Sequence, residues 1–114
     1  MAKDGATFTM NGGEISGNTA ESGGGGISLA NTTFRISNGI VYGSEADADK
    51  ANKAPPPVYA PAGYIYSGAS LSIINLLNFN GVAQYGTGST WTDIPVNTIG
   101  GRDTTIKVVN GVLQ

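Results

Sequence analysis

The chain has 114 residues, a formal net charge of −2 at pH 7, and neither cysteine nor histidine. Charged residues make up 12% of it, about half the usual share, and the six Lys and Arg are scattered along its length. This composition excludes disulfides and thiolate metal sites, removes histidine as a metal ligand or general base, and leaves no basic patch for nucleic acid. We therefore expect a single domain, residues 1–114, with no cofactor and no nucleic-acid partner.

The N-terminal part alternates short apolar pairs with glycine. Phe8 and Met10 are two residues apart, as are Ile27 and Leu29, and four glycines at 23–26 precede the second pair. Apolar residues at period two predict short, half-buried strands. Glycine supplies the backbone conformations that tight corners between such strands require. No helical period of useful length occurs, so the sequence predicts an all-β chain.

Several segments of the chain repeat. Residues 7–18, TFTMNGGEISGN, align without gaps on residues 33–44, TFRISNGIVYGS, and residues 32–41 align in turn on residues 104–113, TTIKVVNGVL. A second element recurs as GGGGISL at 23–29 and SGASLSI at 67–73, and NGVAQYG at 80–86 echoes NGIVYG at 38–43. Repeats that return in the same order and direction predict stacked coils, in which equivalent residues lie above one another.

We therefore predict a short parallel β-solenoid of about four irregular coils, counted from the repeats. The Asn-Gly dipeptides at 11, 38, 80 and 110 leave an alternative open. Asn-Gly is the strongest short-range signal of a β-hairpin, and hairpins would give an antiparallel β-sandwich or meander instead.

The solenoid register predicts which side chains point inward. Intervening residues such as Thr9, Arg35 and Lys107 should share one outward column. The predicted core consists of Phe8, Met10, Ile15, Ile27, Leu29, Phe34, Ile36, Val41, Leu71, Ile73, Ile106, Val108 and Leu113.

Residues 44–63, SEADADKANKAPPPVYAPAG, carry four of the chain's five prolines and predict an inserted loop. Its carboxylates Glu45, Asp47 and Asp49 are candidate calcium ligands, because alternating acids can chelate a hard cation. The cluster lacks the glycine and distal Glu of an EF-hand loop, so a solvated acidic loop is the favoured interpretation.

The C-terminal half holds an irregular apolar region, residues 74–103, which we expect to cap the last coil with Trp91 and Leu76 or Leu77. The strand with Phe8 and Met10 has no such cover and should lie open, ready to pair with an upstream coil or a second copy. Aromatic residues could also stack on the sugar rings of a host or surface glycan, and the candidates are Tyr59, Tyr64, Tyr66 and Trp91.

The stretch FTMNGGEISGNTAESGGGG, residues 8–26, resembles the repeat unit of large bacterial surface proteins with right-handed parallel β-helices. That unit has the form F-x-M-x-G-G-x-I-x-G-N-x-A followed by a glycine run. The later segments TFRISNGIVYGSEA, GVAQYGT and TTIKVVNGVLQ are similar to the region that follows those repeats in some members. The resemblance implies a right-handed solenoid, a C-terminal fragment or short member, a cell-surface or secreted location, and an adhesin-like role by analogy.

We predict a non-enzymatic structural or binding module with no catalytic residues. The alternative from another class is a polysaccharide-active β-helix enzyme, a lyase or hydrolase, which needs facing carboxylates or clustered acids with a base. The acids of this chain are dispersed instead, and Arg102 beside Asp103 fits a solvated turn. MAKDGATF at the start lacks the apolar stretch of a signal peptide, and the longest apolar run, residues 64–79, is too short and broken to span a membrane.

Overall fold

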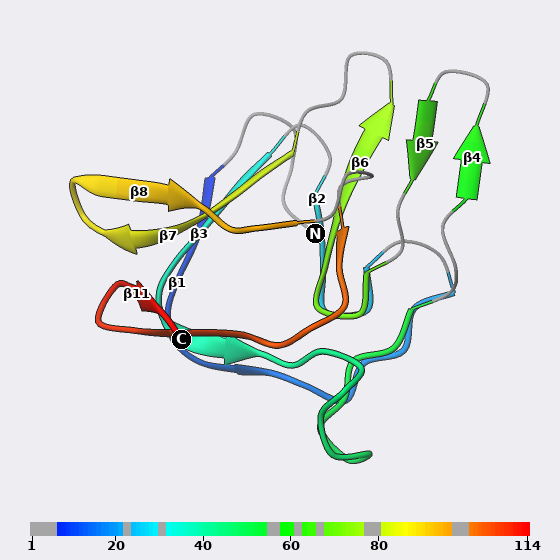
Figure 1. The fold of residues 1–114 in the computed structure, drawn as a ribbon, viewed down its shortest axis with the longest axis horizontal. Coiled ribbons are helices and arrows are strands. Elements are labelled where there is room, and N and C mark those ends of the chain that lie inside the picture. Colours follow the sequence, from blue (N-terminus) through cyan, green and yellow to red (C-terminus); the bar gives the residue numbers. More distant parts are fainter. Residues whose placement is uncertain are drawn as a thin grey trace.

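The computed structural model describes residues 7–21, 24–29, 32–54, 58–60, 63–65, 68–76, 81–96 and 101–114, and within them all regular structure is β. The strands form a six-stranded and a five-stranded sheet (Figure 1). In chain order they are β1 (Thr7–Ile15), β2 (Ile27–Leu29), β3 (Thr33–Val41), β4 (Val58–Ala60), β5 (Gly63–Ile65), β6 (Leu71–Leu76), β7 (Val82–Thr87), β8 (Thr90–Asp93), β9 (Gly101–Arg102), β10 (Ile106–Val109) and β11 (Val112–Leu113).

Strand β3 is the centre of the six-stranded sheet. It pairs along its whole length with β1, in parallel, on one edge. Its other edge pairs first with β7, in parallel, and then with β10, antiparallel. Strands β8 and β11 extend this second edge as antiparallel hairpin partners of β7 and β10. Strand β1 is therefore an outer strand, and no described strand pairs with its other edge.

The five-stranded sheet is built around β6. Strand β2 pairs with β6 in parallel, whereas β5 and β9 pair with it antiparallel, and β4 adds to β5 as a hairpin. Figure 1 shows this sheet on the opposite side of the interior from the curled six-stranded sheet. Within the described part of the chain, β2 has β6 as its one partner strand.

The predicted right-handed parallel β-helix is wrong. Both sheets are mixed, and the six-stranded sheet ends in two antiparallel hairpins rather than in further coils. The prediction of an all-β chain is confirmed, and the mixed arrangement fits the alternative of a sandwich or meander. The physical cause is visible at Asn110 and Gly111, whose φ angles of 49° and 78° form the hairpin turn between β10 and β11.

Two of the sequence matches nevertheless correspond to neighbouring parallel strands. Phe8 lies opposite Phe34, and Ile27 lies opposite Leu71, at the offsets that the repeats predict. The match of residues 104–113 to 32–41 fails, because β10 runs antiparallel to β3 and places Ile106 opposite Val41. The match of 80–86 to 38–43 fails as well, because β7 pairs with Thr33–Ile36.

The core lies between the two sheets and contains most of the predicted residues. Phe8 is the exception, with 45% of its surface exposed, and Ile15 and Leu113 are partly buried against the core. The side chain of Ile73 lies outside the described part. The buried cluster consists of Met10, Ile27, Leu29, Phe34, Ile36, Val41, Leu71, Ala83, Ile94, Ile106 and Val108.

The predicted outward column is correct in part. Thr9 and Arg35 are direct neighbours on β1 and β3, and Arg35 alternates with the buried Phe34 and Ile36. Lys107 is exposed, but it lies opposite Ile40 and so does not share their column. The reversed direction of β10 accounts for this difference.

The segment predicted as an inserted loop, 44–63, is integrated into the fold. Asn52 is fully buried, Lys53 forms a bridge with Thr19, and the last part of the segment contributes β4. The glycine run packs against this segment: a Cβ at Gly25 would lie 2.6 Å from the carbonyl oxygen of Lys53. Glycine is required here because two backbones meet directly at the corner that leads into β2.

The predicted cap is only partly described. Residues 82–93 form the β7–β8 hairpin, whereas Leu77 and the side chain of Leu76 lie outside the described part. Trp91 does not belong to the buried cluster. It lies with Arg35 on the face of the sheet that points away from the core, so it does not cover the interior as predicted.

Candidate functional site

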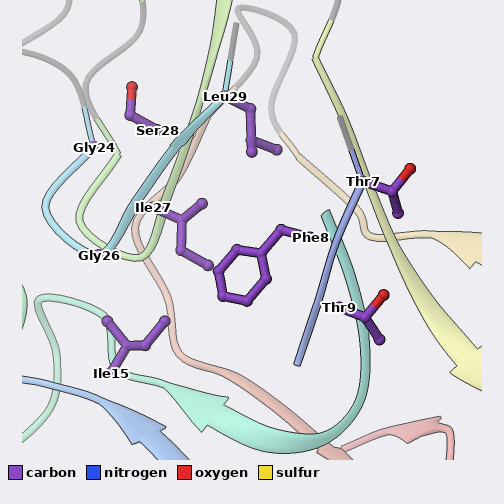
Figure 2. A pocket seen from close by; sticks show the side chains of 9 residues that line it. All are labelled: Thr7, Phe8, Thr9, Ile15, Gly24, Gly26, Ile27, Ser28 and Leu29. Carbon is purple, nitrogen blue, oxygen red and sulfur yellow. The ribbon is translucent and has the colours of Figure 1, made fainter. Parts of the chain in front are cut away.

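An apolar cavity of about 720 Å³ opens between β1 and β2, at one end of the space enclosed by the two sheets. Figure 2 shows Phe8, Ile15, Ile27 and Leu29 around its interior, contributed by strands from both sheets. None of the described residues that line it carries a titratable side chain. They are Thr7, Phe8, Thr9, Ile15, Gly24, Gly26, Ile27, Ser28 and Leu29. We call β1, β2 and this cavity the open end.

The core continues to β1 and β2, and no further described strand pairs with their outer edges, where the cavity opens. Phe8 and Phe34 occupy the same position in adjacent parallel strands, and their rings meet edge to face with centroids 5.6 Å apart. Phe34 is completely buried, whereas Phe8 is 45% exposed. The ring of Phe8 thus has the packing of a core residue on one side only.

The backbone edge of β1 lies beside the cavity. In its first part, Thr7–Met10, β1 follows β3 in regular parallel register. The register then shifts twice, between Met10 and Asn11 and between Asn11 and Glu14, and Gly13 has a φ of 85°. This bulge bends the second half of β1. The first half, Thr7–Met10, is therefore the regular part whose outer edge can pair with another strand.

Residues 7–13 carry none of the charged or proline residues that often protect an edge strand. The one charged residue of β1 is Glu14, which forms an ion pair of 3.7 Å with Lys50. This edge therefore presents a neutral, regular backbone next to apolar side chains, which is the arrangement that favours addition of another strand.

The three calcium candidates are not grouped around a common point. Glu45 accepts a hydrogen bond of 2.7 Å from the amide of Thr105, and the carbonyl of Asp47 accepts the amides of Lys50 and Ala51 in a turn. Among the described residues, no three Asp, Glu, His or Cys side chains are grouped so that they could hold a metal ion. Glu45 instead fastens residues 43–45 to the segment before β10.

The contacts of Glu45 make the stability of the protein depend on pH. Partial burial raises its pKa, but hydrogen bonds from Thr105 and the charge of Arg102 outweigh this, and the net pKa lies below the ordinary 4.5. A carboxyl group whose pKa is lower in the folded than in the unfolded state stabilises the fold at pH values above its unfolded pKa. This stabilisation is lost as the pH falls through the folded pKa.

We therefore expect Glu45→Gln to flatten the loss of stability on acidification below about pH 4.5, the ordinary value for a glutamate. The measurement is urea denaturation of the variant and the wild type at a series of pH values between neutrality and pH 3. Stability curves that run parallel through this acid range would contradict the role assigned to Glu45.

The aromatic candidates that the structure describes lie on strands of both sheets. Tyr59 and Tyr64 lie opposite each other in the backbone register of the β4–β5 hairpin, and Tyr66 lies outside the described residues. The guanidinium of Arg35 lies 5.0 Å from the ring centroid of Trp91, so one face of this ring is already occupied. Glycan stacking on these residues stays a prediction.

Arg102, considered above beside Asp103, is held by backbone groups. Its guanidinium donates to the carbonyls of Pro95 and Thr105, at 3.0 and 3.3 Å. Burial lowers its pKa, with a smaller opposing effect from the charge of Glu45. Arg102 thereby ties together the segments on either side of β9, which is a structural role.

Two features of the site were missed by reading the sequence. Strand β2 lies across the cavity from β1, and Asn52 fastens the corner below them through bonds to Asn18 and to the carbonyls of Ile15 and Tyr42. The glycine run before Ile27 signals the corner, but no local pattern indicates that a polar side chain at position 52 is buried.

The chain matches no protein-family model, no curated protein and no solved structure. In its described part there is no helix with the length and apolarity to cross a membrane. The site is therefore interpreted from its geometry and chemistry.

Proposed function

We propose that the protein is a non-enzymatic interaction module that binds an extended protein segment at its open end. The observation that carries this proposal is the neutral edge of β1 beside an apolar cavity of about 720 Å³. A segment bound as an added strand would gain main-chain hydrogen bonds from β1 and would place alternate side chains in the cavity. Location at a cell surface, implied by the resemblance, stays a prediction.

The composition of the cavity supports binding rather than catalysis there. The described residues that line it carry Thr, Ser, Phe, Ile and Leu side chains, and none of these is a carboxylate or a base. Polysaccharide cleavage would require an acid pair, or acids with a base, around the substrate. Turnover of an acidic polysaccharide by the purified chain would favour the enzymatic alternative.

The proposal predicts that the open end binds a peptide with the sequence of residues 7–15, TFTMNGGEI. In this chain β1 already pairs with a strand of matching pattern, with Phe8 opposite Phe34 and Met10 opposite Ile36. We expect saturable binding of the fluorescently labelled peptide, measured by anisotropy. Phe8→Glu should weaken this binding at least ~10-fold, about 1.4 kcal/mol, because it places a charge at the mouth of the cavity.

The matched control is Val112→Glu, which makes the same kind of change at another exposed apolar residue. Val112 is 58% exposed on β11 and does not line the cavity. It should bind the peptide like the wild type, and circular dichroism should show that both variants are folded. If no binding were seen at a protein concentration of ~1 mM, the free energy of binding would be weaker than about −4 kcal/mol. That result would contradict the proposed function.

A further inference from the structure

We propose that the open end is occupied by the open end of a second copy of this chain, with the two β1 strands antiparallel about a two-fold axis at Thr9. This inference rests on the proposed function, because it names the partner of the same site. It starts from the self-complementary chemistry of β1. The inner edge of β1 already pairs with a strand of its own pattern, Thr7 with Thr33 and Phe8 with Phe34.

The geometry of two free edges decides the direction of pairing. If two β1 strands met in parallel, the core faces of the two copies would point to opposite sides of the joined sheet. Antiparallel pairing about a two-fold axis perpendicular to the sheet keeps both core faces on the same side. The two cavities then face each other and merge, and one symmetric contact covers the apolar residues of both copies.

The alternation of side chains decides the register. Phe8 points to the cavity (Figure 2). Met10 is buried in the core, whereas Thr9 between them is exposed. Residues directly opposite in an antiparallel pair point to the same face. An axis at Thr9 places Phe8 of each copy opposite Met10 of the other, so both inward-facing apolar residues gain an apolar neighbour.

This register is also compatible with charge. Glu14 lies five positions from the axis, beyond the bulge, and is already paired with Lys50 in its own copy. The two Glu14 carboxylates therefore lie on opposite sides of the axis, well separated. Thr7 of one copy lies opposite Asn11 of the other, a neutral pair.

The far side of the six-stranded sheet favours a closed pair over a growing chain of copies. Its outer strands are β8 and β11, of four and two residues. β8 ends at Asp93, and Pro95 follows two residues later, which are features that discourage edge pairing. A head-to-tail assembly that extends the six-stranded sheet would have to join β1 to one of these edges, whereas a two-fold pair uses the same edge twice.

The absence of cysteine from the chain allows a direct test by cross-linking. In Thr9→Cys the two thiols of a pair would lie on directly opposite residues, with Cα atoms about 4.5–5.5 Å apart, within the range of a disulfide. We expect a covalent dimer to form under mild oxidation, and Phe8→Glu added to this variant to prevent it. The matched control is Thr92→Cys, an exposed residue of the edge strand β8, which should form no covalent dimer under the same oxidation.

The register is tested by mixing two variants. Thr7→Cys and Asn11→Cys should cross-link to each other when mixed and much less when each is oxidised alone. Sedimentation of the wild type should show a concentration-dependent dimer. A folded Thr9→Cys protein that stays monomeric, together with a monomeric wild type, would overturn the inference. If these proteins were monomeric but the wild type still bound the peptide of residues 7–15, the proposed function would stand without the dimer. If the wild type were monomeric and did not bind the peptide, both the dimer and the proposed function would be wrong.

Discussion

Replacing Phe34 by alanine should destabilise the protein by about 3–5 kcal/mol, the usual cost of truncating a fully buried phenylalanine. Phe34 is 0% exposed and is the largest of the completely buried side chains that the structure describes. It contacts the ring of Phe8 and belongs to the cluster that joins the two sheets. Urea denaturation followed by circular dichroism measures the change in the free energy of unfolding.

The chain offers a matched control in Phe8→Ala. Phe8 occupies the equivalent position one strand away, directly opposite Phe34, but it is 45% exposed. Its truncation removes less buried surface, so we expect a loss of about 1–2 kcal/mol. Equal losses of stability in Phe8→Ala and Phe34→Ala would mean that the open end is covered in solution. Dimer formation at high protein concentration would cover it in this way. A loss below about 1 kcal/mol for Phe34→Ala would contradict the core described above.

The strand register around these two residues could be predicted from sequence because the matching segments are parallel neighbours. Thr-Phe at positions 7 and 8 repeats at 33 and 34, and the structure places these pairs opposite each other. Ile27 and Leu71 follow the same rule in the other sheet. Similar residues in adjacent parallel strands occupy the same position relative to the core. An alignment of the two segments therefore predicts which residues lie opposite each other.

The overall arrangement could not be predicted in this way, because an alternating strand pattern reads alike in both directions. The segment TTIKVV resembles TTFRIS, yet the strand that contains it, β10, runs antiparallel to β3. The turn at Asn110 and Gly111 sends β11 back along β10, whereas at Asn38 and Gly39 strand β3 continues without a hairpin. The same dipeptide thus forms a turn in one context and part of a continuous strand in another, and tertiary contacts decide between them.

The open end was predictable in part. Apolar alternation at Phe8 and Met10 predicts a strand whose outer edge is ready to pair, and the described strands leave that edge unpaired. The cavity beside it depends on β2, which comes from a different part of the chain and a different sheet. Its shape follows from long-range packing, which no local pattern in one sequence contains.

Asn52 shows the same limit for a polar residue, and its replacement is the second large effect that we expect. The side chain is completely buried, although the surrounding composition predicts a solvated loop. Its amide nitrogen donates to the carbonyls of Tyr42 and Ile15, at 2.7 and 3.0 Å. Its oxygen accepts from the backbone and side-chain nitrogens of Asn18, at 3.0 and 3.1 Å.

Asn52→Ala should therefore destabilise the protein by about 2–4 kcal/mol, because it leaves several partly buried backbone groups without a partner at once. The control is Asn38→Ala, which removes one exposed bond of 2.8 Å from the amide of Asn110 and should cost at most about 1 kcal/mol. Hydrogen exchange should also locate the effect: the amides of Asn18 and Tyr42, in the segments that Asn52 joins, should lose protection. If Asn52→Ala were no more destabilising than Asn38→Ala, the segment around residue 52 would be a solvated loop after all, and the corner that supports the open end would be held by the backbone alone.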